Sequence, residues 1–128
     1  MMGFPIHWPG VGRKLMGAGK SAGYSQDFPF VLIRSDGSML KYCSWDWMLG
    51  RDYLTAGWTK INNEAAYYAD GRAAAFDMAC FGLSCDELYL LRSGTTVEDL
   101  SVWRVSVVES VAISVDEFED VLRRGSGV

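Results

Sequence analysis

The tripeptide Gly19-Lys20-Ser21 lies in the glycine-rich stretch 16–23 and has the residue types that end a nucleotide-binding P-loop. That loop requires Gly-x4-Gly-Lys-Ser/Thr, because successive backbone amides and the lysine surround the phosphates. Lys14 stands five residues before Gly19, where the motif needs its first glycine. No strand pattern precedes the stretch, and a helix pattern does not follow it. These residues therefore predict a flexible or partner-contacting loop and not a nucleotide site.

Three cysteines and one histidine limit the nucleophilic and metal chemistry of the chain. Cys43, Cys80 and Cys85 have no paired spacing, which argues against a disulfide framework. A thiol nucleophile needs a neighbouring base, and His7 is the single imidazole. We therefore expect buried free thiols, and we expect neither a metal site nor a cofactor.

Asp46 and Asp52 flank an aromatic-rich segment. Two carboxylates of this kind could serve the acid–base chemistry of glycoside hydrolysis. Their separation along the chain does not fix their separation in space, and acids at a sheet edge or in a turn are the more common case. We favour that second interpretation and predict no catalytic residues.

The concentration of aromatic residues between positions 45 and 68 is the most informative feature of the sequence. Tryptophan and tyrosine combine a large apolar area with a polar tip, which suits a ligand pocket or a protein interface. Core packing beneath helices is the alternative, and the sequence leaves both open. The candidate ligand or interface residues are Trp45, Trp47, Arg51, Asp52, Tyr53, Trp58, Tyr67 and Tyr68.

Charge is distributed unevenly over the 128 residues, whose formal net charge is −4. Residues 1–24 hold Arg13, Lys14 and Lys20 and no acid, so the rest of the chain is acidic. An acidic body lacks the clustered Lys and Arg that neutralise phosphates, so we expect no nucleic acid partner. It permits binding to a basic protein surface or to a small molecule.

No apolar run approaches the roughly 20 residues that span a bilayer, so we expect no membrane partner. The first residues show no basic region followed by an apolar stretch, which predicts no secretion signal and a cytoplasmic location. Residues 1–27 are predicted to form an extended, glycine-rich arm that packs on its own domain or on a second subunit. Its apolar residues are the candidates for that contact: Phe4, Ile6, Trp8, Leu15 and Met16.

The strongest hairpin pattern covers residues 28–45, with Asp36-Gly37 between two β-rich runs. Asp-Gly favours a two-residue type I′ turn, which would pair Ile33 with Leu40. Residues 46–62 are ambiguous, although 58–61 alternate like a strand. For 63–81 we favour a second hairpin centred on Asp70-Gly71 over an alanine-rich helix, a choice the sequence does not settle.

Capping boxes predict the remaining helices. The first, beginning at Ser84, predicts a short helix over 88–91, and residues 95–98 suggest a turn or one short helical piece. The alternation over 101–113 indicates one long strand, bulged near Glu109. Ser114 begins the clearest helix, with Phe118, Val121 and Leu122 on one apolar stripe.

Together these patterns predict a single α+β domain over 28–128. We expect a mostly antiparallel, twisted sheet of five or six strands, with the C-terminal helix and one or two short helices on one face. The function that we favour is a small cytosolic binding or accessory protein of microbial or mobile-element origin. It would act through a protein–protein interface and self-associate. The alternative is a small-molecule binding module for an apolar or aromatic ligand, or an enzyme, with an aromatic-lined pocket around Trp45, Trp47, Tyr53 and Trp58.

Overall fold

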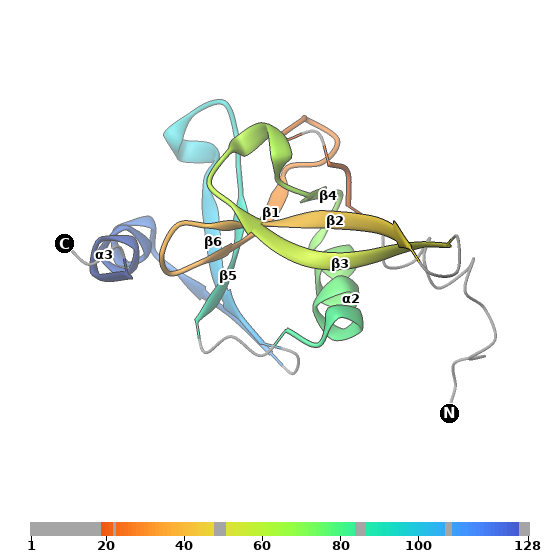
Figure 1. Ribbon diagram of the computed structural model, residues 1–128. Helices are drawn as coiled ribbons and strands as arrows, with labels where there is room; N and C mark the ends of the chain where they lie inside the picture. Colours follow the sequence, from red (N-terminus) through yellow and green to blue (C-terminus); the bar gives the residue numbers. More distant parts are fainter. Residues whose placement is uncertain (1–18, 22, 48–50, 84–86, 107–108, 126–128) are drawn as a thin grey trace.

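The computed structural model describes residues 19–21, 23–47, 51–83, 87–106 and 109–125, with the side chains of 44–47, 51–54 and 97 excepted (Figure 1). The described residues form one antiparallel sheet in the order β3-β2-β1-β5-β6-β7, and β4 pairs with β1 outside this path. The strands are β1 (Phe30–Arg34), β2 (Met39–Trp47), β3 (Arg51–Thr59), β4 (Tyr67–Tyr68), β5 (Leu88–Arg92), β6 (Ser101–Val105) and β7 (Ser110–Ile113). The described helices are α2 (Gly71–Phe81) and α3 (Val115–Gly125), with the short 3-10 turns η1 (Asn62–Glu64) and η2 (Val97–Asp99). The α+β class is confirmed.

The β1–β2 hairpin lies where the sequence predicts it, but its register differs by one residue. Ile33 pairs with Met39, and the Gly37 amide donates to the Arg34 carbonyl at 2.9 Å. The loop therefore has three residues and ends at Gly37, whose φ of 89° lies in the left-handed region. This is the turn followed by a glycine bulge that three-residue hairpin loops adopt. The predicted pairing of Ile33 with Leu40 is wrong.

Residues 63–81 form β4 and α2 and not a second hairpin. Asp70 is the N-cap of α2: its carboxylate accepts a hydrogen bond from the Ala73 amide at 2.8 Å. Gly71 is the first helical residue, where the cost of a glycine is smaller than in a helix interior, and Gly82 ends the helix with a φ of 62°. The Asp-Gly pair that resembles a turn is therefore a helix start.

Two further elements correct the prediction. Residues 88–91 belong to strand β5 and not to a short helix, while Ser84 lies outside the described residues. The single strand predicted over 101–113 is a hairpin of β6 and β7, closed by a hydrogen bond from the Ser106 amide to the Glu109 carbonyl at 2.8 Å. The expected helical piece near residue 97 is present as η2.

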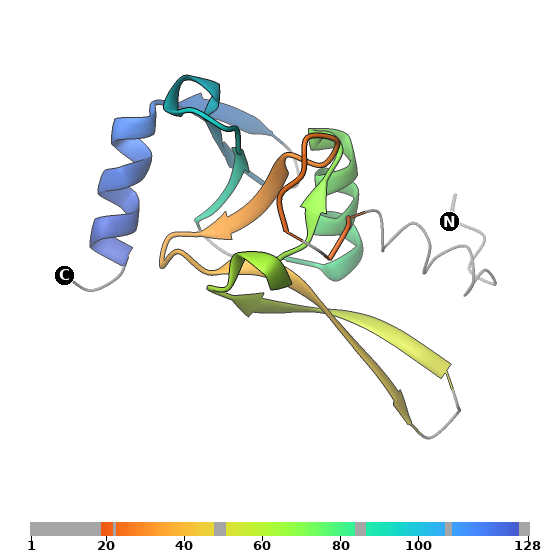
Figure 2. The same ribbon diagram turned by 90° about the horizontal axis from the view of Figure 1, so that it is seen from above.

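The two helices cover opposite faces of the sheet, whereas the sequence analysis places them on one face. Leu32 and Leu90 pack with α2 through Ala74 and Met78. Their neighbours on the other face, Ile33 and Tyr89, pack with α3 through Phe118 and Val121. Adjacent strand residues point to opposite faces, so β1 and β5 are buried on both sides. Figure 2 shows α3 and α2 separated by the central strands.

The predicted C-terminal helix is confirmed in its cap and its stripe. The Glu117 amide donates to the Ser114 hydroxyl at 3.0 Å, and Phe118 and Val121 are buried while Leu122 is half-buried. At the other end of the sheet, the β2–β3 hairpin extends away from the rest of the molecule (Figure 2). The fold thus has a helix-covered centre and one projecting hairpin.

Candidate functional site

Five of the eight predicted site residues lie in the distal half of the β2–β3 hairpin. The register places Trp45 opposite Tyr53 and Trp47 opposite Arg51, and Asp52 is opposite Asp46. Their side chains are outside the described part of the structure, so a role in a pocket or interface stays a prediction. The antiparallel pairing does bring these positions, which are up to eight residues apart, together on one hairpin.

Trp58 and Tyr67 lie nearer the centre of the molecule. Trp58 pairs with Leu40 and packs half-buried against the core cluster that includes Leu40. The guanidinium carbon of Arg34 lies 4.1 Å from the centroid of the Trp58 ring, which is cation–π geometry. Tyr67 is 3% exposed, and its hydroxyl donates to the Asn62 side-chain carbonyl. The two rings belong to different core clusters, and a role of either in binding stays a prediction.

A buried polar cluster consists of Tyr42 on β2, Tyr68 on β4 and Asp77 on α2. The sequence analysis did not identify it. Asp77 is fully buried on α2, and its Oδ2 accepts hydrogen bonds from the hydroxyls of Tyr42 and Tyr68. The Tyr68 contact is 2.9 Å long. Among the described residues, Asp77 Oδ1 has no hydrogen-bond partner. Tyr68 is the one predicted site residue whose described contacts form a polar cluster.

The cluster changes the proton affinity of its members. Burial raises the pKa of Asp77 to about 6, and the two tyrosine hydrogen bonds act in the opposite direction without cancelling the effect of burial. Burial also raises the pKa of both Tyr42 and Tyr68, and the Asp77 hydrogen bonds and charge add to it. Cys80, one turn along α2, has a pKa raised by burial and by the Asp77 charge. The tyrosine hydroxyls therefore stay protonated and act as donors.

The Gly-Lys-Ser tripeptide is tied to this cluster by its backbone. The Gly19 amide donates to the Tyr42 hydroxyl at 2.8 Å, and a Cβ added at Gly19 would lie 2.7 Å from that oxygen. Lys20 exchanges two backbone hydrogen bonds with Tyr67, and its Nζ lies 5.7 Å above the Phe28 ring. These groups are engaged within the chain, and the predicted contact of this loop with a partner stays a prediction. The arm candidates at positions 4 to 16 lie outside the described residues.

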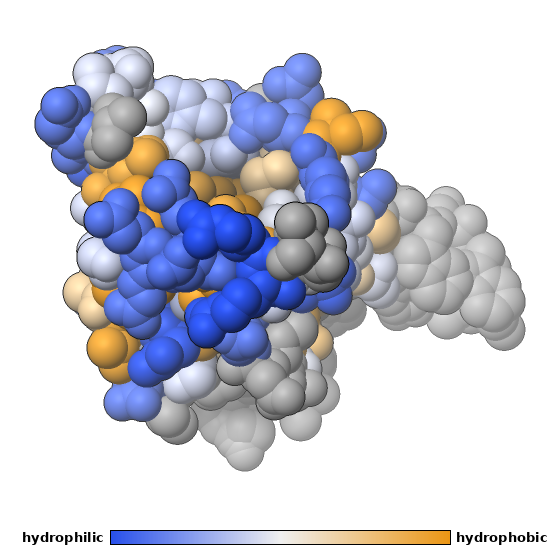
Figure 3. Space-filling model, turned by 90° about the vertical axis from the view of Figure 1, so that its left-hand side faces the viewer, coloured by the Kyte–Doolittle hydropathy of each residue, from blue (hydrophilic) through white to orange (hydrophobic). Residues whose placement is uncertain are grey.

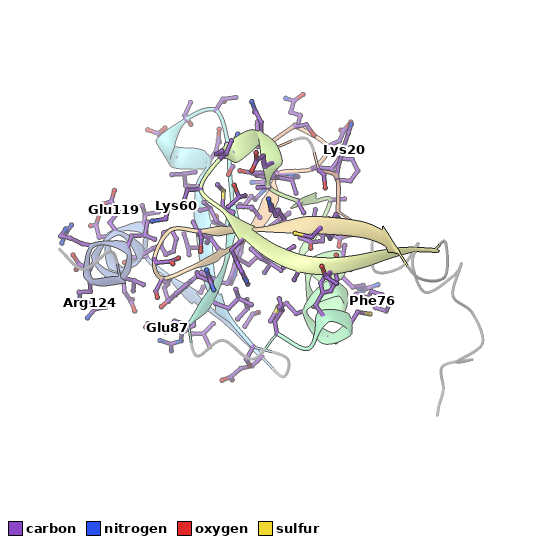
Figure 4. The ribbon with its side chains drawn as sticks, viewed as in Figure 1. Lys20, Lys60, Phe76, Glu87, Glu119 and Arg124 are labelled. Atoms are coloured by element: carbon purple, nitrogen blue, oxygen red, sulfur yellow. The ribbon has the colours of Figure 1, made fainter. Side chains whose placement is uncertain are left out.

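A cavity of about 290 Å³ lies between α2 and strands β5 and β6. None of the eight predicted site residues is among those that line it. Leu32, Ala74, Met78 and Leu90 form its buried floor, and Glu109 lies at its rim. Its sequence signal is faint: small residues on one stripe of α2 opposite apolar strand residues, a pattern that ordinary core packing also produces. A second hollow, at the C-terminal end of α3 near Arg124, lies well away from α2, on which Figure 4 marks Phe76.

Within the described ranges, no group of three or more His, Cys, Asp and Glu residues could hold a metal ion. The described helices include none with the length and apolar character needed to cross a membrane. Comparison of the chain with family models, with curated proteins and with solved structures gives no match.

Proposed function

We propose that this is a binding protein that joins a strand of another polypeptide to the outer edge of β3, and that its partner is a second copy of the chain. The observation that carries the proposal is the position of β3 at the end of the sheet. Strand β3 is nine residues long, and among the described residues its one strand neighbour is β2. An edge of this length offers a row of backbone donors and acceptors to another strand.

The hydrogen bonds of β2 indicate which groups of β3 face that edge. The carbonyls of Ser38 and Leu40 accept from Arg34 and Ala66, on the side away from β3. In an antiparallel ladder the direction of the backbone groups alternates along the strand. The odd-numbered residues of β2 therefore bond to β3, and among the β3 residues that they oppose is Gly57. The amides of Ala56 and Trp58 then point outward.

The two edges of the sheet differ in protection. Charged residues, prolines and short strands keep an edge from pairing with other chains. The part of β3 over 53–59 contains no charged residue and no proline. At the opposite edge, β7 has four residues and directly follows Glu109. The contrast favours β3 as the pairing edge.

The face of the molecule that includes α3 supports the same choice. In the space-filling view this face is mostly hydrophilic, with smaller hydrophobic areas between the charged side chains (Figure 3). Arg123 and Asp120 form an exposed ion pair there, which water screens and which contributes little. The α3 face is therefore not favoured as the contact between two copies. Two β3 strands can pair through a two-fold axis, because identical strands that pair antiparallel are related by such an axis.

The test is the mass of the protein in solution, measured by sedimentation equilibrium over a range of concentrations. We expect a dimer that Thr55→Lys and Ala56→Pro convert to a monomer. Thr55→Lys puts a charge on an exposed position of β3, and Ala56→Pro removes an outward amide without removing a β2–β3 hydrogen bond. Ala112→Lys, at an exposed position of the opposite edge, is the matched control and should remain a dimer. The proposal fails if the unmodified protein is a monomer at every concentration.

A further inference from the structure

The cavity beside α2 exists because small residues face the strands there. Gly71, Ala74 and Ala75 line it from the helix, and a Cβ added at Gly71 would lie 3.3 Å from a methyl carbon of Leu90. Larger side chains at these positions would fill the space between helix and sheet. The remaining volume of about 290 Å³ is close to the lower end of the range found for ligand pockets.

The floor of the cavity is apolar. Leu32 is fully buried, and Met78 and Leu90 are 3% and 7% exposed. A polar ligand group on this floor would lose its hydrogen bonds to water without replacement, which is unfavourable. The floor therefore suits the apolar part of a ligand, and the volume suits one ring with a short substituent.

The rim on the β6–β7 side carries Glu109, the one charged residue among the described residues of the lining. Its backbone is held by Ser106, whose amide donates to the Glu109 carbonyl at 2.8 Å and whose hydroxyl accepts from the Glu109 amide at 3.3 Å. Among the described residues no cation lies within ion-pair distance of the Glu109 carboxylate. An ammonium group at this rim would form a charge-assisted hydrogen bond with it.

We propose that this cavity is a binding site for a compact apolar ligand with one ammonium group. The ring lies on the floor of Leu32, Met78 and Leu90, and the ammonium group faces Glu109. The site uses neither β3 nor the tryptophans of the hairpin, so its test does not depend on the proposed self-association.

Titration by nuclear magnetic resonance with benzylamine, benzyl alcohol and benzoate tests the proposal. These probes share a ring and differ in the charge of the substituent. We expect benzylamine to shift the methyl resonances of Met78 and Leu90 and to bind about tenfold more tightly than benzyl alcohol, with benzoate weakest. A tenfold ratio corresponds to about 1.4 kcal/mol, which is the scale of one charged hydrogen bond.

Two exposed alanines of α2 give a matched pair of variants. Ala75 lines the cavity and Ala79 does not, and both are exposed, so a phenylalanine at either position leaves the core intact. Ala75→Phe should abolish benzylamine binding, and Ala79→Phe should retain it. Glu109→Gln should bring benzylamine and benzyl alcohol to similar affinity. The proposal is overturned if benzylamine causes no shifts at millimolar concentration, if Ala75→Phe binds it as before, or if benzoate binds as tightly.

Discussion

The buried carboxylate of Asp77 makes a quantitative prediction for the variant Asp77→Asn. The pKa of this carboxyl is about 6 in the folded protein and 3.8 in its ordinary environment. Each pKa unit corresponds to 1.36 kcal/mol, so the difference is worth about 3 kcal/mol of unfolding free energy. Asparagine has nearly the same shape and keeps an acceptor for the hydroxyls of Tyr42 and Tyr68, but it does not titrate.

The direction of the effect follows from which state holds the proton more firmly. Between pH 3.8 and about 6 the folded state binds the Asp77 proton more tightly than the unfolded state. The stability that the bound Asp77 proton gives the folded state is therefore fully present below pH 3.8. It decreases as the pH rises and is lost above about pH 6. The free energy of unfolding of the unmodified protein, minus that of Asp77→Asn, should fall by about 3 kcal/mol from pH 3.5 to pH 7.

Urea unfolding, followed by far-ultraviolet circular dichroism at half-unit steps of pH, measures this difference. The amide NH2 that replaces Oδ1 changes stability equally at every pH, so it shifts the curve without altering its slope. Tyr68→Phe removes one donor to the carboxylate and should move the transition to higher pH. A difference that is constant with pH would refute the reasoning, because it would mean that the tyrosine hydrogen bonds cancel the effect of burial on the Asp77 pKa. A difference that increases with pH would also refute it, because the hydrogen bonds would then outweigh burial.

Three further substitutions test the local structure by the same unfolding assay. Asp70→Ala removes the N-cap of α2 and should lower the free energy of unfolding by about 1 kcal/mol; if residues 70–71 formed a hairpin turn instead, the helical circular dichroism signal would not change. Gly37→Ala should cost about 1 kcal/mol through its positive φ alone, since an added Cβ meets no atom within 4 Å; an unchanged midpoint would exclude the three-residue loop. Phe118→Ala should cost about 3 to 5 kcal/mol, because this side chain is 5% exposed beside Tyr89; a loss below 1 kcal/mol would show that α3 is not docked there.

Sequence features within one element predicted its structure correctly where one side of that element is buried and the other is exposed. The cap and apolar stripe of α3 predict its start and its buried face, because the stripe packs on the sheet and the rest of the helix is exposed. The Asp36-Gly37 pair likewise locates the first turn. Its loop length was not decided by the sequence, since a left-handed glycine suits both a two-residue turn and a three-residue loop with a bulge.

The failed predictions share a physical cause in the two-sided burial of the sheet. β5 has helices on both faces, so Leu88, Tyr89 and Leu90 are all buried and the strand lacks alternation. A short continuous apolar run cannot be distinguished by period from a buried helix. The choice of a hairpin over 63–81 failed differently, because Asp-Gly suits an N-cap as well as a turn.

The Asp77 cluster was beyond sequence reasoning for another reason. Its partners are 35 and nine residues away, and only the crossing of α2 beneath β2 and β4 brings the three side chains together. The sequence of an alanine-rich helix does not show whether its aspartate lies on the buried or on the exposed face. The aromatic residues were easy to see, yet their residue type alone did not separate packing, as at Trp58, from binding.

Helix α2 contacts both the cavity and the projecting hairpin. One of its stripes places Ala74 and Met78 at the cavity, and another places Asp77 against Tyr42 of the projecting hairpin. Any energetic coupling between ligand binding and self-association would be reciprocal: benzylamine would change the dimer dissociation constant by the factor by which dimerisation changes benzylamine affinity. Thr55→Lys and Ala75→Phe each remove one process and leave the residues of the other in place. The ratio of the benzylamine affinities of the unmodified dimer and of the Thr55→Lys monomer therefore gives the coupling factor, and a ratio of one means that the two sites are not coupled.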